Sequence, residues 1–194
     1  MTSHTIKHMV AACAVAMLFG CETVPELIDQ SNDTGHTTAG LDYRDFNRAA
    51  DDSVKELLAS GAVNRPGRPY ALVVSRILNK TTEVVDTDLL IKRIRVALMR
   101  AGKVQVTTAW GIAGPEDKMT ALVQEEVGSP DTTVKPELSL SGKIIEPRQK
   151  CYDSSTNQQE FHFQLTLTDL NTGLSVWEDE RKVVKRVSSK TVTW

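Results

Sequence analysis

Two stretches in the last third of the chain alternate apolar and polar residues at almost every position. The first covers residues 138–145 (LSLSGKII), and the second covers residues 161–168 (FHFQLTLT). Because successive side chains of a strand point to opposite faces, this pattern predicts strands with one face on a core and one toward water. The apolar face of such strands must be covered by another layer of the protein.

Apolar residues at helical spacing predict three helices upstream of these strands. The first spans residues 43–60, where Asp42 can cap its start and Gly61 can end it. The second runs over residues 87–101, and the third opens near Pro115. Among the residues that this spacing places toward a core are Leu89, Met119, Leu122 and Val123.

Three more strands complete the predicted sheet, at residues 70–78, 103–108 and 174–184. The near-continuous apolar run of the first suggests a central strand covered on both faces. In the last strand we place Leu174 and Val176 on the apolar face, so Trp177 points to the other face. The element order predicts an α+β fold, with a mixed, largely antiparallel sheet of about five strands and about three helices packed mainly on one face.

The N-terminus predicts an export signal. Residues 9–20 (MVAACAVAMLFG) form an apolar run that is too short for a stable spanning helix but suits the core of a signal peptide. The run ends in Gly20-Cys21, which resembles the lipobox of bacterial lipoproteins, whose cysteine becomes lipidated. The alternative is a buried helix with an incidental cysteine.

The lipobox resemblance sets the expected domain boundaries. Residues 1–20 form the signal peptide, Cys21 carries the lipid and begins a flexible polar tether over residues 21–40, and residues 41–194 form one periplasmic domain. Bacterial lipoproteins generally carry three acyl chains, so the resemblance implies a permanent anchor. By the sorting rule of enteric bacteria, Glu22 after the cysteine points to the outer membrane.

Composition and motifs argue against several functions. The 23 Lys and Arg residues are balanced by 25 Asp and Glu residues, whereas nucleic-acid binders usually show a basic excess. Beyond the signal peptide, the only histidines are His36 in the tether and His162 on an outward strand position, which are badly placed for a metal site or a Ser-His pair. No glycine-rich catalytic or phosphate-binding motif occurs. We therefore expect no enzyme activity, cofactor, metal or small-molecule substrate.

Two groups of residues are candidate partner surfaces. The first is an outward row of strand residues, rich in small hydroxyls and free of acid, in which Trp177 is either an anchor for a partner or a residue packed over a sheet edge or under the C-terminal tail. An ordinary solvated face is the alternative reading of this row, because Thr is a good strand residue. The second is a basic helix face that could meet an acidic partner, or could be a solvated face whose last charges complement the helix dipole. The first group comprises Lys143, His162, Gln164, Thr166 and Trp177, and the second comprises Lys92, Arg95 and Arg100.

Three segments of the chain resemble the LpoB-like outer-membrane lipoprotein activators of penicillin-binding proteins. In residues 71–108 a strand ends in an Asn-Lys-Thr turn, followed by a helix and a Gly-Lys strand, as in that family. Residues 138–146 and 163–180 match as well, and the run from Leu167 to Trp177 is the most specific piece. The resemblance implies binding to a bifunctional penicillin-binding protein and regulation of peptidoglycan synthesis, and hence of the cell wall. The alternative, from another class, is a structural subunit of a secretion or flagellar-ring assembly in the envelope.

Overall fold

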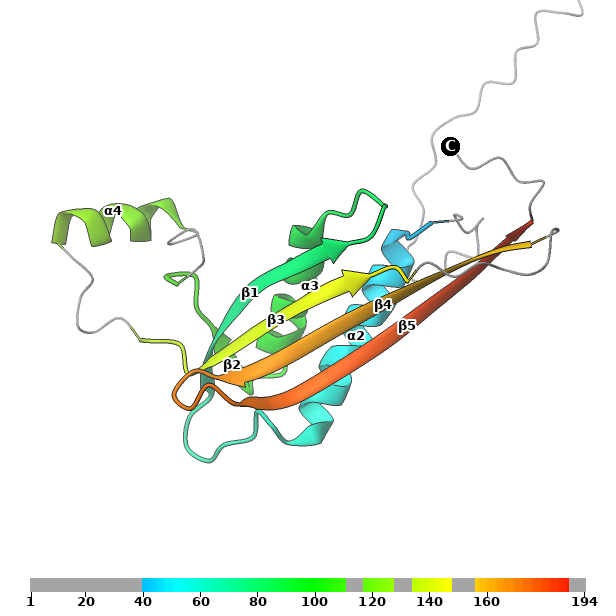
Figure 1. Cartoon of the computed structure of the whole chain (residues 1–194). Helices are drawn as coiled ribbons and strands as arrows, with labels where there is room; N and C mark the ends of the chain where they lie inside the picture. Colours follow the sequence, from blue (N-terminus) through cyan, green and yellow to red (C-terminus); the bar gives the residue numbers. More distant parts are fainter. Residues whose placement is uncertain (1–39, 111–116, 128–133, 148–155, 189–194) are drawn as a thin grey trace, which may run out of the picture. The chain divides into compact units, whose positions relative to one another are not determined.

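The computed structural model describes residues 40–110, 117–127, 134–147 and 156–188. The predicted signal peptide, Cys21 and the tether before Gly40 lie outside these residues. Figure 1 follows the described chain through its helices and strands in sequence order. These elements are α2 (Tyr43–Ser60), β1 (Tyr70–Lys80), α3 (Thr87–Arg100), β2 (Val104–Val106), α4 (Lys118–Val127), β3 (Leu138–Ile145), β4 (Thr156–Asp169) and β5 (Ser175–Ser188).

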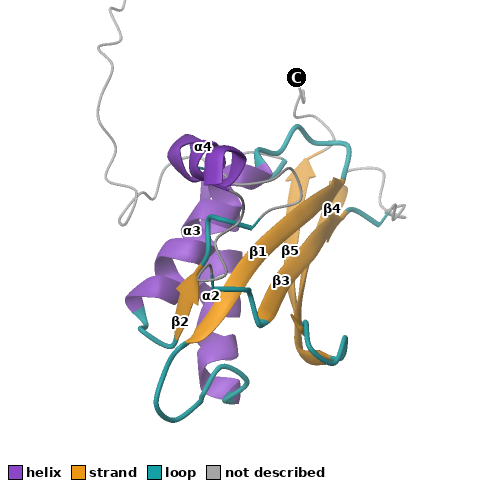
Figure 2. Cartoon of the chain, turned by 90° about the vertical axis from the view of Figure 1, so that its left-hand side faces the viewer, coloured by secondary structure: helices purple, strands orange, loops and turns teal. Residues whose placement is uncertain are grey.

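The five strands form one mixed sheet in the order β2-β1-β3-β4-β5. β1 pairs in parallel with β2 and β3, while β3, β4 and β5 pair antiparallel. Helices α2 and α3 lie on one face of this sheet, where α2 packs against β5 and α3 against β1 and β2 (Figure 2). The predicted α+β class and the mixed five-stranded sheet are confirmed.

Helix α2 begins and ends at the residues expected from its caps. The Asp42 side chain accepts the backbone N–H groups of Arg44 and Asp45, and the Asp45 side chain accepts the N–H of Asp42 at 2.9 Å. Gly61 then stops the helix with a φ of +82°, a conformation that costs glycine little. These reciprocal bonds satisfy backbone donors that the first helical turn leaves without partners.

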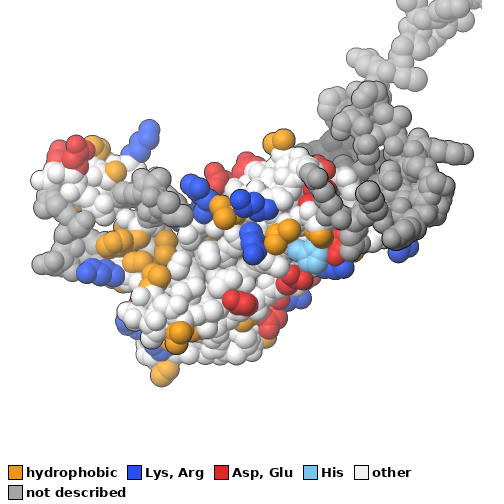
Figure 3. Space-filling view, in the orientation of Figure 1, with side chains coloured by type: hydrophobic (Ala, Val, Ile, Leu, Met, Phe, Trp, Pro, Cys, Tyr) orange, Lys and Arg blue, Asp and Glu red, His pale blue; other side chains and the backbone are white. Residues whose placement is uncertain are grey.

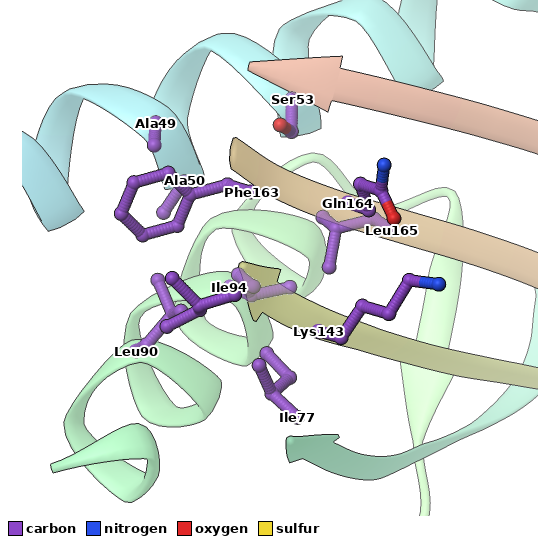
Figure 4. A pocket seen from close by; sticks show the side chains of 11 residues that line it. Ala49, Ala50, Ser53, Ile77, Leu90, Ile94, Lys143, Phe163, Gln164 and Leu165 are labelled. Atoms are coloured by element: carbon purple, nitrogen blue, oxygen red, sulfur yellow. The ribbon is translucent and has the colours of Figure 1, made fainter. Parts of the chain in front are cut away.

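The core lies between the two helices and the sheet face that they cover. Figure 4 shows apolar side chains of α2, α3 and β4 converging there, among them Ala50, Ile94 and Phe163. The gap that remains between them measures only about 10 Å³. Small-molecule sites span roughly 300–1,000 Å³, so this gap is a packing defect and not a ligand pocket.

Several residues predicted to face the core are exposed instead. In α3 the buried stripe is Leu90, Ile94 and Leu98, which leaves Leu89 about 100° around the helix and 70% exposed. In α4 the side chains of Met119, Leu122 and Val123 are also exposed. Periodicity located both helices, but it does not determine which apolar residues another element covers.

The second half of the strand predicted at residues 70–78 is covered on only one of its two faces. There Ile77 is buried under the helices, while Arg76 and Leu78 are exposed on the opposite face. The register shift between Val74 and Ile77 places two successive residues toward the face without helices. Coverage on both faces, expected from the apolar run, is therefore wrong for this part of β1.

A charged cluster ties the loop before β1 to the start of β3. Both guanidinium groups of Arg65 and Arg68 donate to the two oxygens of Glu137 at 2.8–3.2 Å. The backbone N–H of Ala71 donates to the same carboxylate, and Arg65 also stacks on the ring of Tyr70. The hydrogen bonds from Arg65 and Arg68 lower the pKa of Glu137 from 4.5 to about 2.

Replacing Glu137 with glutamine is expected to lower the free energy of unfolding by about 2 kcal/mol at pH 7, because hydrogen bonds to a charged group are lost. Since folding lowers the pKa of Glu137, its contribution is present above pH 4.5 and is lost as the pH falls toward 2. Urea denaturation of both proteins at pH 7 and pH 3 should therefore show a difference that shrinks in acid. Glu126→Gln on the exposed side of α4 is the matched control, and an equal effect of both substitutions at pH 7 contradicts this role of Glu137.

Candidate partner-binding face

The sheet face opposite α2 and α3, hereafter the helix-free face, carries most of the first predicted surface. Lys143 of β3 lies beside Gln164 of β4, and the next outward pair along these strands is Ser141 with Thr166. His162 lies two residues before Gln164 on the same face. Four of the five predicted residues therefore form one continuous polar row, and their contact with a partner stays a prediction.

The orientation predicted for Trp177, the fifth residue, is wrong. It is only 8% exposed, pairs with the buried Leu167, and donates its indole N–H to Glu56 of α2 at 2.5 Å. Between Leu167 and Thr168 the register with β5 shifts, so that Val176 is an extra residue opposite β4. Such a bulge reverses the alternation of side chains, which turns Trp177 toward the helices and leaves Val176 exposed.

The helix-free face is also more acidic than the residues of β3 and β4 alone indicate. Strand β5 places Glu178 opposite Thr166 and Glu180 opposite Gln164. Figure 3 shows acidic side chains beside the histidine on this face. The outward residues of β3 and β4 that we predicted include no acid, but Glu178 and Glu180 of the neighbouring strand β5 lie directly beside them.

His162 is held between two carboxylates on the helix-free face. Its Nε2 lies 2.7 Å from Oε1 of Glu160, and its Nδ1 lies 2.9 Å from Oε1 of Glu180. Glu160 is buried and also forms an ion pair with Lys182. Gln164 donates its amide to the second oxygen of Glu180. Both ring nitrogens thus face acceptors, an arrangement that suits the doubly protonated imidazolium.

Protonation of His162 is expected to stabilise the fold. Burial of the ring opposes the charge, but the hydrogen bonds to Glu180 and Glu160 raise the pKa of His162 above its usual 6.5. A raised pKa adds stability that is fully present below pH 6.5 and is lost as the pH rises through the folded-state pKa. His162→Gln should therefore lower the melting temperature more at pH 5.5 than at pH 9, and a difference that does not change with pH contradicts the imidazolium assignment.

A shallow depression of about 550 Å³ lies over β3, β4 and β5 on the helix-free face. Ser141 and Lys143 of β3 and Gln164 and Thr166 of β4 line it, and Gly142, in register with the inward Leu165, contributes only its backbone. Lys143 and the two carboxylates Glu178 and Glu180 border it. The depression therefore offers a cation, anions and amide groups within reach of one side chain of a partner.

The second predicted surface lies on the other side of the domain. Lys92 and Arg100 are exposed on α3, and Arg95 is half-buried. Arg93, between them, instead forms a bidentate ion pair with Asp51 of α2 at 2.7–3.1 Å. Because α3 covers the opposite sheet face, a partner of ordinary size cannot contact this group and the helix-free face through one flat surface.

Glu160, Glu178, Glu180 and Lys182 belong to the site but were not among the residues predicted for it. The alternation that placed His162 outward also places Glu160 outward, so this residue could have been found from the sequence. The outward placement of the β5 residues depends on the bulge, which the sequence does not reveal.

Within the described residues no group of three or more His, Cys, Asp or Glu side chains could hold a metal ion. None of the helices described is long and apolar enough to span a membrane.

The described residues thus form an α+β domain with one helix-covered and one polar sheet face. The model of the family "Peptidoglycan-synthase activator LpoB" matches residues 45–183, which is more than half of the chain. The chain therefore belongs to the LpoB family of peptidoglycan-synthase activators. No curated protein matches it in a sequence comparison.

Solved structures of the same family are similar to the chain. The C-terminal domain of LpoB from Escherichia coli is 17% identical with a TM-score of 0.45, over 72% of this chain and 98% of that domain. The corresponding domain from Salmonella enterica is 17% identical with a TM-score of 0.44, over the same shares of both chains. The solution structure of Escherichia coli LpoB is 16% identical with a TM-score of 0.42, over 88% of this chain and 86% of that one.

Proposed function

We propose that the chain is an outer-membrane lipoprotein that binds a bifunctional penicillin-binding protein and stimulates peptidoglycan synthesis. The observation that carries this proposal is the family match over residues 45–183, since the family is one of peptidoglycan-synthase activators. The Gly20-Cys21 sequence after an apolar run supports the lipid anchor. In this function the domain contributes a binding surface and no reacting groups.

The helix-free face is the surface that we assign to the synthase. Lys143 is exposed at its centre and has no ion-pair partner among the described residues. Interface energy concentrates in a few anchors around a well-packed centre. We therefore expect Lys143 to contact a carboxylate of the synthase, with a neighbouring side chain of the synthase in the depression beside Gly142.

The anchor is tested by replacing Cys21 with serine in intact cells. If Cys21 is lipidated, the variant should leave the membrane fraction or keep its signal peptide, because the lipid attachment is lost. Cys13→Ser, within the expected signal peptide, is the matched control and should remain in the membrane. A Cys21→Ser protein that still fractionates with outer membranes and migrates like the parent contradicts the anchor.

Crosslinking in intact cells, followed by purification of the chain, tests the choice of partner. We expect a bifunctional penicillin-binding protein to be recovered with the parent chain and to be depleted with a Lys143→Glu variant. Recovery of ring-shaped assemblies of the chain with secretion or flagellar components would instead support the structural-subunit alternative. Recovery of neither class of partner contradicts the proposal.

A further inference from the structure

Strand β5 forms a long free edge of the sheet. All of its 14 residues except Val176 pair with β4 along one side, and no strand of the described residues pairs with the other side (Figure 1). A free edge presents a row of backbone N–H and C=O groups that can accept another strand. Most strands are shorter than this one, so β5 offers an unusually long edge for pairing with another strand.

The charges along β5 are segregated into two halves. Residues 178–180 are Glu, Asp and Glu, and every charged residue after them in the strand is basic. The basic residues are Arg181, Lys182, Lys185 and Arg186. Charged residues on an edge usually discourage pairing with arbitrary strands. A second β5 in antiparallel orientation is the exception, because the acidic half of each strand then lies opposite the basic half of the other.

The side chains of β5 select one register for this pairing. A two-fold axis perpendicular to the sheet keeps outward residues opposite outward residues. If the axis passes through Lys182, near the middle of the strand, Glu178 of each copy lies opposite Arg186 of the other. Moving the axis by one residue in either direction places Glu178 opposite Val184 or Ser188 instead.

Glu178 and Arg186 are the two outward charges of β5 that lack an ion pair among the described residues. Within the part of the chain that the structure describes, Glu178 accepts a side-chain hydrogen bond only from the hydroxyl of Ser175, and the Arg186 side chain donates only to Gln158. Both side chains are exposed. Lys182, which would face its own copy across the axis, is already neutralised by its ion pair with the buried Glu160. With the axis at Lys182, Glu178 and Arg186 of the two copies can form ion pairs with each other. The ion pair between Lys182 and Glu160 within each copy is kept.

We propose that a second copy of this chain pairs with β5, so that two domains form one continuous sheet through reciprocal contacts between Glu178 and Arg186. This two-fold pairing closes on itself and gives a dimer, whereas a ring requires a different interface. It does not depend on the proposed function, because the pairing uses the backbone edge of β5, although Glu178 also borders the depression on the helix-free face.

Sedimentation of the full chain in detergent tests the pairing. We expect a dimer whose dissociation constant rises at least ~10-fold in Glu178→Arg and in Arg186→Glu, because each single reversal opposes like charges. The double variant exchanges the two charges and should return to within ~3-fold of the parent. Lys92→Glu, exposed on α3 and away from the edge, is the control and should leave the dimer unchanged. A monomer at all concentrations, a ring, or a double variant as weak as the single variants overturns the proposal.

A second measurement does not depend on charge. In a Cys151→Ser background, Lys182→Cys places two thiols opposite each other at the axis, where Cβ atoms of facing strand residues lie about 4.5–5.5 Å apart. A disulfide needs a Cβ separation close to the lower end of this range. Mild oxidation should therefore crosslink Lys182→Cys into a dimer and leave Lys143→Cys monomeric on a non-reducing gel. Equal crosslinking of both variants, or none for Lys182→Cys with an unchanged melting temperature, contradicts the register.

Discussion

Replacement of Trp177 by alanine is expected to lower the free energy of unfolding by about 3–5 kcal/mol, as for other buried aromatic residues. Trp177 packs between β4 and α2, and its indole N–H donates a hydrogen bond to the carboxylate of Glu56. The substitution both leaves a cavity beneath α2 and removes the hydrogen bond to Glu56. Urea denaturation followed by circular dichroism measures the change.

Two controls separate packing from partner contact at this position. Val176→Ala, at the exposed neighbour, should change stability by no more than ~0.5 kcal/mol. Trp177→Phe keeps most of the apolar volume, so it should cost less than Trp177→Ala. If Trp177→Ala leaves stability unchanged and instead weakens synthase binding at least ~30-fold, Trp177 is an outward anchor and the bulge in β5 is wrong.

Charge reversal at Lys143 is expected to weaken binding to the bifunctional penicillin-binding protein at least ~30-fold, about 2 kcal/mol. Its ammonium is exposed and has no ion pair within the described residues, so a contacting carboxylate of the synthase would then face a like charge. Stability should change little, since no described side chain loses a partner. Calorimetric titration of the synthase with the Lys143→Glu chain measures the affinity.

The basic group on α3 provides the matched comparison for Lys143. Lys92→Glu and Arg100→Glu make the same charge change on the opposite side of the domain. We expect both variants to bind the synthase within ~3-fold of the parent, as substitutions outside an interface do. The opposite pattern, with loss of binding in these two variants and not in Lys143→Glu, assigns the interface to α3.

Local signals in the sequence were enough to locate most of the fold. Asp42 and Gly61 bound α2 because capping is decided by residues next to the helix end. The alternation in β3 and β4 correctly placed residues such as Leu140 and Phe163 inward, since both strands run without a bulge along their shared register. In these places the conformation of each residue depends on its neighbours in the chain.

The errors occur where the conformation depends on distant parts of the chain. The bulge opposite Leu167 is created by pairing with β4, and it reversed the side assigned to Trp177. The exposure of Leu89 depends on how α3 lies on the sheet, which periodicity does not fix. The same holds for the site, because the carboxylates of Glu178 and Glu180 reach the row of His162 and Gln164 only through the register of β5.

The proposed function is tested most directly by the rate of glycan synthesis by a purified bifunctional penicillin-binding protein. The assay compares the synthase alone, with the full chain in detergent, and with the Lys143→Glu variant. The proposal predicts that the full chain raises the rate and that the variant reaches the same rate only at a concentration at least ~30-fold higher. An unchanged rate at saturating concentrations of the full chain, with synthase that is active on its own, contradicts the proposal.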